Sequence, residues 1–539
     1  MSIASTFPDG LRVKQVEGAL RIKQKRRILL ADQPGAGKTA QALVALEMDG
    51  IFTSKTATLI LCNVTGCQLT WAGELRTRVE SQYDVVVCDL TDTRGRKTMP
   101  SMAARDEALA QKMLEAIDLD LPLIVLANYE AVRWRAGQTP KLPTLWDITF
   151  DAIVIDEAHL VLPTMEDHPK KLTQFWYGLL QIKTTSDAFR IAMSGTPDRG
   201  KLWNRYGHWK FLYPTSYRNF WTWVRQIFVV TQGQWGGAEI GKLRREQEWA
   251  AYEAEHMVRR TKAEMLEGLP EKQWAGDGGI DLPMTPLQED AYIDYERYLE
   301  ARQMELVADG KDGEAQALRL QFALRSRQMA TCTWAFTETV GDDGKVHTTG
   351  KPIVAGPESS NKLAWLLDWL GSRGYIAGDG FDASLGKVVI VSYFTEVLHW
   401  LQAELQAANI GSQIIAGDTS ANSKIQTEDA FQRGDLRIVL LSGYMGVSIN
   451  LDAADDMIFV DSVHDPDRME QAEDRIHRAS RNHQVTYWRL ASIDTGDMVV
   501  LQTIDTRYRQ TRAMYEGHRG VAFARRMLGY LPEPEKENA

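Results

Sequence analysis

The stretch ADQPGAGKT, residues 31 to 39, contains the residue types that bind the phosphates of a nucleotide. Glycines let backbone amides converge on a phosphate, Lys38 can reach the β- and γ-oxygens, and the Thr39 hydroxyl can ligate Mg²⁺. An apolar run precedes the stretch and a helical pattern follows it, so a helix N-terminus adds its partial positive charge. Asp32 stands where the usual eight-residue pattern has its first glycine. The residues predicted to hold the nucleotide are Gly35, Ala36, Gly37, Lys38 and Thr39.

A second pattern, FDAIVIDEAH, places two acidic residues directly after an apolar run. Ligands of α/β sheets bind at the carboxyl ends of the strands, which is where such a run would deliver the pair. Asp156 is predicted to hold Mg²⁺, and Glu157 to orient and deprotonate the attacking water. Such a pair alone is also typical of a surface turn, but together with the loop it predicts a nucleotide triphosphatase.

A third pattern, MEQAEDRIHRAS, has Arg475 and Arg478 three positions apart, on one face of a predicted helix. A triphosphate held between two lobes needs positive charge from the opposite lobe to stabilise the transferring phosphoryl group. An arginine pair on a helix is more often a solvated surface, so this interpretation depends on the surrounding sequence.

Short runs rich in β-branched residues must position these groups. They fall into two sets, 28–195 and 387–490, and continuous apolar strands separated by helical stretches predict parallel sheets covered on both faces. The interval between the sets is helical, and TETVGDDGKVHTT predicts a hairpin. The fold class is therefore α/β, with two parallel-sheet lobes and helical insertions between them. The expected domains are 1–200 (lobe 1), 201–355 (helical insertions with the hairpin), 356–505 (lobe 2), and 506–539 (a C-terminal helix and acidic tail).

The composition limits the possible partners and compartment. The chain has 539 residues and a net charge of −10, which argues against a protein coated in positive charge but not against a local nucleic-acid patch. No apolar run approaches the roughly 18 residues that span a bilayer, so no membrane association is expected. The N-terminus lacks the apolar core of a signal peptide, so a cytoplasmic location is expected. The protein is also expected to be a monomer. The four cysteines show no CxxC spacing, and neither disulfides nor a zinc site is predicted.

In order along nearly the whole chain, these motifs resemble those of the Swi/Snf-like ATPases of helicase superfamily 2, in the form of a minimal motor core of bacterial or viral type. The resemblance implies two RecA-like lobes, with ATP and Mg²⁺ as cofactors. It places Gln15 on the adenine, explains Asp32 as the family's own replacement for the first glycine, and adds Gln471 to the catalytic residues Arg475 and Arg478. The segments that carry it include LRVKQVEGA, LLADQPGAGKT, LILCNVTGCQLTWAGEL, MSGTPDRGKLWNRYGHWKFLYP, HMVRRTKAEMLEGLPEK, KVVIVSYFTEVLHWLQAEL, LLSGYMGVSINL and QAEDRIHR.

Two segments depart from the family pattern. Met445 and Ser448 replace two glycines of motif V and leave Gly446, and the residues after the arginine pair read Ala-Ser-Arg where the family has Ile-Gly-Gln. Both departures lie where the second lobe couples ATP to its track. The residues predicted to relay the nucleotide state toward that track are His159, Ser194, Thr196 and Gly446.

The resemblance implies movement along double-stranded DNA rather than processive strand separation. Phosphate contacts carry no sequence information, so such a motor is expected to be sequence-tolerant and salt-sensitive. Arg259, Arg260 and Lys262 are candidate nucleic-acid contacts, although a charge run is equally typical of a solvated face. The five tryptophans between Trp203 and Trp235 are expected to form the core of a helical protrusion rather than a base-stacking surface.

Two alternatives remain at this level. One is a strand-separating DNA or RNA helicase of the DEAH type, although HRASRNHQ lacks that group's glycine-spaced double arginine. The other is a slow, nucleotide-gated clamp that binds DNA, which the motif V departures keep open. Protein partners that supply targeting are possible in each case.

Overall fold

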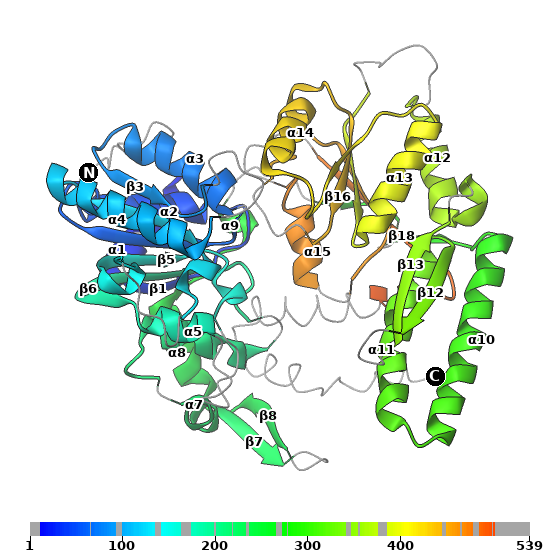
Figure 1. Cartoon of the computed structure of the whole chain (residues 1–539), viewed down its shortest axis with the longest axis horizontal. Helices are drawn as coiled ribbons and strands as arrows, with labels where there is room; N and C mark the ends of the chain where they lie inside the picture. The colour runs from blue at the N-terminus through cyan, green and yellow to red at the C-terminus, as the bar shows by residue number, and fades with distance from the viewer. Residues whose placement is uncertain are drawn as a thin grey trace, which may run out of the picture. The chain divides into compact units, whose positions relative to one another are not determined.

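The structure is a computed structural model, and it describes residues 11–501 apart from 65, 93–99, 135–141, 163–173, 199–200, 218, 233–236, 266–271, 277–278, 341–345, 354–355, 376–384, 445–448, 464–465, 478–483 and 499. Two predicted site residues, Gly446 and Arg478, and the predicted C-terminal segment 506–539 lie outside the described residues. The chain divides between Glu267 and Gly268 into two compact units, called lobe 1 and lobe 2 below (Figure 1). Residues 201–267 of the predicted helical interval belong to lobe 1, and 268–355 to lobe 2.

Lobe 1 contains, in its described part, a parallel sheet with the strand order β3-β4-β2-β5-β6-β1-β9. Leu30 at the end of β1 pairs with Met193 of β6, and Ile155 at the end of β5 pairs with Ala192 of β6. The chain therefore leaves β1, β5 and β6 at one edge of the sheet. The strands are β1 (Arg27–Leu30), β2 (Ala57–Cys62), β3 (Val86–Asp89), β4 (Leu123–Asn128), β5 (Thr149–Ile155), β6 (Lys183–Met193) and β9 (Met257–Val258).

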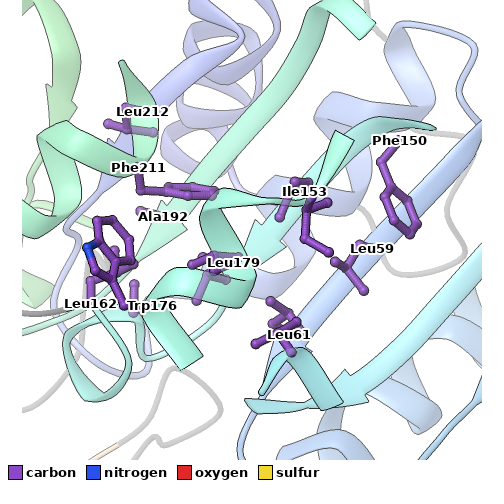
Figure 2. Close-up of a cluster of buried hydrophobic side chains, with 14 of the residues drawn as sticks. Leu59, Leu61, Phe150, Ile153, Leu162, Trp176, Leu179, Ala192, Phe211 and Leu212 are labelled. Atoms are coloured by element: carbon purple, nitrogen blue, oxygen red, sulfur yellow. The ribbon is translucent and has the colours of Figure 1, made fainter. Parts of the chain in front are cut away.

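Apolar side chains cover both faces of this sheet. Leu29 and Leu59 belong to one buried cluster, while their neighbours Leu30 and Ile60 belong to another. Alternate residues of a strand point to opposite faces, so strands buried on both sides must be apolar throughout, as the runs in the sequence are. Figure 2 shows part of the first cluster, in which strand residues such as Leu61 lie near Leu179 of the helix α5 (Gln174–Leu180).

The remaining elements of lobe 1 surround the sheet or extend from it. The helix α2 (Lys38–Met48) is buried over most of its length, and most of its buried residues are alanine or leucine. A π-helical segment, η1 (Gly66–Trp71), follows β2. The other described α-helices and strands are α1 (Val13–Lys25), α2 (Lys38–Met48), α3 (Ala72–Glu74), α4 (Met102–Leu119), α6 (Tyr206–Leu212), α7 (Phe220–Ile227), β7 (Phe228–Gln232), β8 (Ala238–Leu243), α8 (Glu246–His256) and α9 (Lys262–Met265).

The aromatic segment after β6 packs inward. Trp209 is fully buried with its ring edge-on to Tyr252, and Trp223 is buried against Phe228 and Trp249. Such arrangements contribute stability beyond the burial of area. The expectation of a tryptophan core is confirmed for these two residues, and Trp235 lies outside the described residues.

Lobe 2 repeats the architecture with the described strand order β10-β18-β17-β14-β16-β15, and β11 also pairs with β18 in parallel. Val389 and Ile390 of β14 belong to two different buried apolar clusters, so apolar side chains again cover both faces of the sheet. Its strands and helices are β10 (Gln273–Trp274), β11 (Ile280–Leu282), α10 (Pro286–Ala308), α11 (Asp312–Thr331), β12 (Trp334–Val340), β13 (Val346–Pro352), α12 (Asn361–Ser372), β14 (Val388–Ser392), α13 (Thr395–Ala407), β15 (Gln413–Ile415), α14 (Ala421–Arg433), β16 (Ile438–Ser442), β17 (Asp456–Phe459), α15 (Pro466–Glu473) and β18 (Thr486–Ser492).

The predicted fold class is confirmed, since each lobe contains helices and a parallel sheet with buried apolar clusters on both faces. The predicted hairpin is also present, because β12 and β13 pair in antiparallel register from Trp334–Pro352 to Val340–Val346. The helices α10 and α11 confirm the predicted helical stretches before it. In the described part of the chain, no helix combines the length and apolarity needed to cross a membrane.

Candidate nucleotide site

The predicted phosphate loop connects β1 to α2. Gly35 and Gly37 have φ angles of 79° and 74°, in the left-handed region where glycine carries no steric penalty. Gly37 is also the N-cap of α2, so the loop ends at a helix N-terminus, which favours the binding of an anion. The Lys38 ammonium is buried and donates to the carbonyl oxygens of Asp32 (2.9 Å) and Gln33 (3.4 Å). A phosphate at this loop would offer Lys38 a stronger acceptor.

Gln15 lies beside the loop, as the resemblance implies for a residue that recognises the base. Its Nε2 donates to the carbonyl oxygen of Ala36 at 3.1 Å, and its Oε1 accepts from the Arg12 amide at 3.0 Å. A β-carbon on Gly37 would lie 2.3 Å from the Gln15 Nε2, so the glycine also makes room for this contact. The helix α1 is thus joined to the loop through one side chain.

The acidic pair follows β5 at the same edge of the sheet. The Asp156 carboxylate accepts hydrogen bonds from the Trp71 indole (Nε1 to Oδ2, 3.0 Å) and from the Glu157 amide (2.9 Å). The Tyr129 hydroxyl donates to the Asp156 carbonyl oxygen at 2.6 Å. Burial and the neighbouring Glu157 raise the pKa of Asp156 to about 6, while Trp71 and Lys38 act in the opposite direction. The influence of Lys38 indicates that the loop and the acidic pair share one electrostatic environment.

Glu157 and the predicted relay residues form one network. Glu157 has a φ of 42°, an unusual conformation for a non-glycine residue, and such strain is found at functional sites. The His159 Nδ1 lies 3.4 Å from the Glu157 Oε2 and 2.9 Å from the Ser194 hydroxyl. That hydroxyl also accepts from the Thr196 amide at 3.2 Å. The structure therefore brings His159, Ser194 and Thr196 together, with the predicted catalytic base at one end.

The donor atoms of this edge fit a magnesium ion. Mg²⁺ prefers oxygen ligands and is usually held by one or two carboxylates together with the phosphates of a nucleotide. Thr39, at the start of α2, and Asp156, after β5, supply a hydroxyl and a carboxylate. Within the described residues, no group of three or more His, Cys, Asp or Glu side chains could hold a metal ion. Thr39 and Asp156 would hold Mg²⁺ together with the phosphates of a nucleotide.

The three basic residues predicted to contact nucleic acid lie against the loop. Arg259 donates to the carbonyl oxygens of Ala31 (3.0 Å) and Gly195 (2.9 Å). Arg260 donates to the Asp32 carboxylate, and the Lys262 amide donates to the Gln33 side chain at 2.6 Å. Their contact with nucleic acid stays a prediction, but each of the two arginines donates at least one hydrogen bond to the loop region, at Ala31 or Asp32.

The described catalytic candidates of lobe 2 lie on and just after α15. Gln471 is on the helix, and Arg475 follows it with a side chain that is 8% exposed. The Arg475 backbone is fixed, because its carbonyl oxygen accepts from the Leu451 amide at 3.0 Å. The action of these residues on a nucleotide stays a prediction.

Sequence patterns did not identify the residues that hold the loop and Asp156 in place. Trp71 and Tyr129 are remote in sequence from Asp156, and Arg260 is 228 positions from Asp32. The sequence did contain one signal for the contact between Arg260 and Asp32, because a carboxylate buried within a phosphate loop requires a cationic partner.

The comparisons with known proteins agree with this geometry. A model described as the SNF2-related domain matches residues 14–333, more than half of the chain. A model described as the helicase conserved C-terminal domain matches residues 375–480. The first match includes the loop and the acidic pair, and the second includes α15 and Arg478.

Three relatives illustrate the similarity. The SWI/SNF-related matrix-associated actin-dependent regulator of chromatin subfamily A-like protein 1 homolog of Caenorhabditis elegans is 23% identical over 92% of this chain and 60% of its own. Chromodomain-helicase-DNA-binding protein 1-like of Danio rerio is 25% identical over 94% of this chain and 44% of its own. A solved Sulfolobus solfataricus SWI2/SNF2 ATPase core in complex with double-stranded DNA is 18% identical over 97% of this chain and 98% of that chain, with a TM-score of 0.36. The chain thus spans less than two thirds of the first two relatives.

Proposed function

The chain belongs to the SNF2-related family of helicase-superfamily ATPases, and on that premise we propose that it couples ATP hydrolysis to movement along double-stranded DNA or to the remodelling of protein–DNA complexes. The observation that carries the proposal is the shared edge of the lobe 1 sheet, where the loop after β1, the acidic pair after β5 and the Ser194–Thr196 turn after β6 are connected by hydrogen bonds and charge.

In this proposal, lobe 1 binds the nucleotide and carries out its hydrolysis. The loop amides and Lys38 bind the β- and γ-phosphates, and Gln15 is positioned at the base end of the loop. Asp156 and Thr39 would hold Mg²⁺, which when bound neutralises charge on the phosphates. Glu157 orients the attacking water and accepts its proton, and the contact of Glu157 with His159 joins that step to Ser194.

Lobe 2 supplies the positive charge in this proposal. Arg475 and Arg478 stabilise the phosphoryl group in the transition state, as arginine residues do in related phosphoryl transfers. Bound ATP then favours one arrangement of the two lobes, and hydrolysis allows the lobes to leave that arrangement. This is the general form of a nucleotide-driven clamp. Movement along the phosphate backbone needs no base contacts.

Displacement of a triplex-forming strand from duplex DNA tests this function, because it reports motion rather than hydrolysis. We expect the wild-type protein with ATP and Mg²⁺ to displace the strand, and the Glu157→Gln variant to bind ATP but leave the triplex intact. Hydrolysis stimulated by duplex DNA without any displacement would contradict movement and favour the nucleotide-gated clamp. Stimulation by single strands or RNA alone would favour the strand-separating helicase.

A further inference from the structure

A buried carboxylate in the nucleotide loop is held by an arginine from the end of lobe 1. Asp32 is fully buried, and Arg260 donates to both of its oxygens, through Nε at 3.0 Å and Nη2 at 2.5 Å. Gln41 of α2 donates to the same carboxylate at 3.1 Å and accepts from Arg260 at 2.8 Å. The charge that replaces the first loop glycine is therefore fully partnered.

The same arginine also reaches the base end of the site. Its Nη1 donates to the carbonyl oxygen of Lys14, the neighbour of Gln15. Arg260 thus connects the loop, α2 and the start of α1, three elements that contact different parts of a nucleotide in the proposed function. We name the set Asp32, Gln41, Arg260 and the Lys14 carbonyl the loop clamp.

A glycine on α1 provides the space for the loop clamp. A β-carbon added to Gly18 would lie 1.9 Å from the Gln41 Oε1 and 2.6 Å from the Arg260 Nη2. Both atoms are held by the hydrogen bonds above, so neither can move without breaking one. Gly18 lies in the interior of a helix, where alanine is intrinsically more stable by about 1 kcal/mol. A glycine here is explained by the close approach rather than by helix stability.

We propose that Arg260 is a positioning residue for the nucleotide. Through the loop clamp it fixes the position of the phosphate loop relative to α1, the helix that carries Gln15. At the position of the usual first glycine, this loop has a carboxylate that pairs with Arg260 in the segment that follows β9. The chain passes into lobe 2 shortly after this segment, between Glu267 and Gly268. The proposal rests on the nucleotide site of the proposed function and adds the residue that sets its affinity.

The test is equilibrium binding of fluorescent ATP and GTP analogues to the full chain, without DNA, alongside steady-state hydrolysis. Hydrogen bonds to buried charges contribute enough free energy that Arg260→Ala should weaken ATP binding about tenfold or more. The kcat at saturating ATP should stay within about threefold, and the preference for ATP over GTP should narrow because Gln15 loses its fixed position. Arg260→Lys should recover part of the affinity.

Gly18→Ala and Asp32→Asn guard against simple misfolding. Gly18→Ala removes no charged group and favours the helix, yet it should weaken ATP binding by displacing Gln41 and Arg260. The effects of Asp32→Asn and Arg260→Ala should be strongly non-additive when combined, because they break the same contact. Arg245→Ala is the matched control, since Arg245 pairs with the exposed Glu248 in lobe 1 and should leave nucleotide binding unchanged.

Unchanged ATP affinity in Arg260→Ala and Gly18→Ala would overturn the proposal. Unchanged ATP affinity with weaker duplex binding in Arg260→Ala would also overturn it and would assign Arg260 to nucleic acid. A wild-type chain that binds ATP but shows no movement on DNA would contradict the proposed function alone, because the nucleotide affinities are measured without DNA.

Discussion

The two lobes place an acidic residue just past a core strand, but they use it differently. Asp156 follows β5 of lobe 1, is partly exposed, and lies near a second carboxylate and Lys38. Asp461 follows β17 of lobe 2, is fully buried, and accepts hydrogen bonds from the Ser392 hydroxyl and from the Tyr393 amide (2.9 Å). An acidic residue at the end of a strand is therefore a candidate for chemistry only where it is accessible to solvent and lies near a phosphate loop.

Among the variants at or near these two acidic residues, Glu157→Gln should cause the largest loss of turnover. Loss of the base that accepts the proton of the attacking water should reduce kcat by about 10²–10⁴-fold, while ATP binding is retained. Steady-state hydrolysis and equilibrium nucleotide binding measure the two effects. Turnover close to wild type in this variant would remove Glu157 from the reaction.

The pH dependence of hydrolysis should also reflect lobe 1. The pKa of Asp156 is raised to about 6, so the carboxylate form needed for Mg²⁺ prevails above that pH and is lost below it. Turnover should fall about tenfold per pH unit below 6, which defines the acid limb of the pH–rate profile. A higher Mg²⁺ concentration should move the acid limb to lower pH because the ion binds the deprotonated form. Because the folded pKa of Asp156 exceeds its unfolded value, its contribution to folding stability is full below the unfolded pKa and is lost as the pH rises through about 6. A flat profile between pH 7 and about 5 would contradict this assignment.

Trp71→Phe should have a smaller effect. It removes the indole donor that lowers the pKa of Asp156 but keeps most of the buried ring. The acid limb should move to higher pH, and kcat at neutral pH should fall several-fold, on the order of one hydrogen bond. Rate profiles of the two proteins measured side by side test this, and coincident limbs would count against it.

The smallest effect on turnover should come from Asp461→Ala in lobe 2. Removal of this acceptor leaves the Ser392 and Tyr393 donors buried without it, so unfolding should become easier by about 2–4 kcal/mol. Turnover per folded molecule should stay within about twofold. Denaturant unfolding followed by hydrolysis measurements would detect either result. A large loss of kcat at unchanged stability would show that the lobes are more alike than proposed.

Much of the fold could be predicted because it depends on local patterns. Continuous apolar runs such as LIVLAN indicate a strand buried on both faces, and the glycines around Lys38 indicate a phosphate loop. The two-residue strand β9 was not predicted, because Met257–Val258 is too short to show a period.

The contacts between distant residues were not predictable from such patterns. The Arg260–Asp32 pair depends on how the chain returns to β1 after a long excursion, and a charge run such as RRTK gives no sign of its partner. The same holds for Trp71 at the end of η1, whose indole donates to the Asp156 carboxylate 85 positions further along the chain. Motif spacing predicts which groups react, and the fold shows which side chains contact Asp32 and Asp156.

In the proposed function, lobe 1 binds the nucleotide and lobe 2 activates its hydrolysis. Paired measurement of kcat and ATP affinity in Arg478→Ala tests this division of roles. An arginine that acts on the transition state contributes about 10³-fold or more to kcat, so we expect a loss of that order with ATP affinity within about threefold of wild type. Full turnover in Arg478→Ala would contradict the claim.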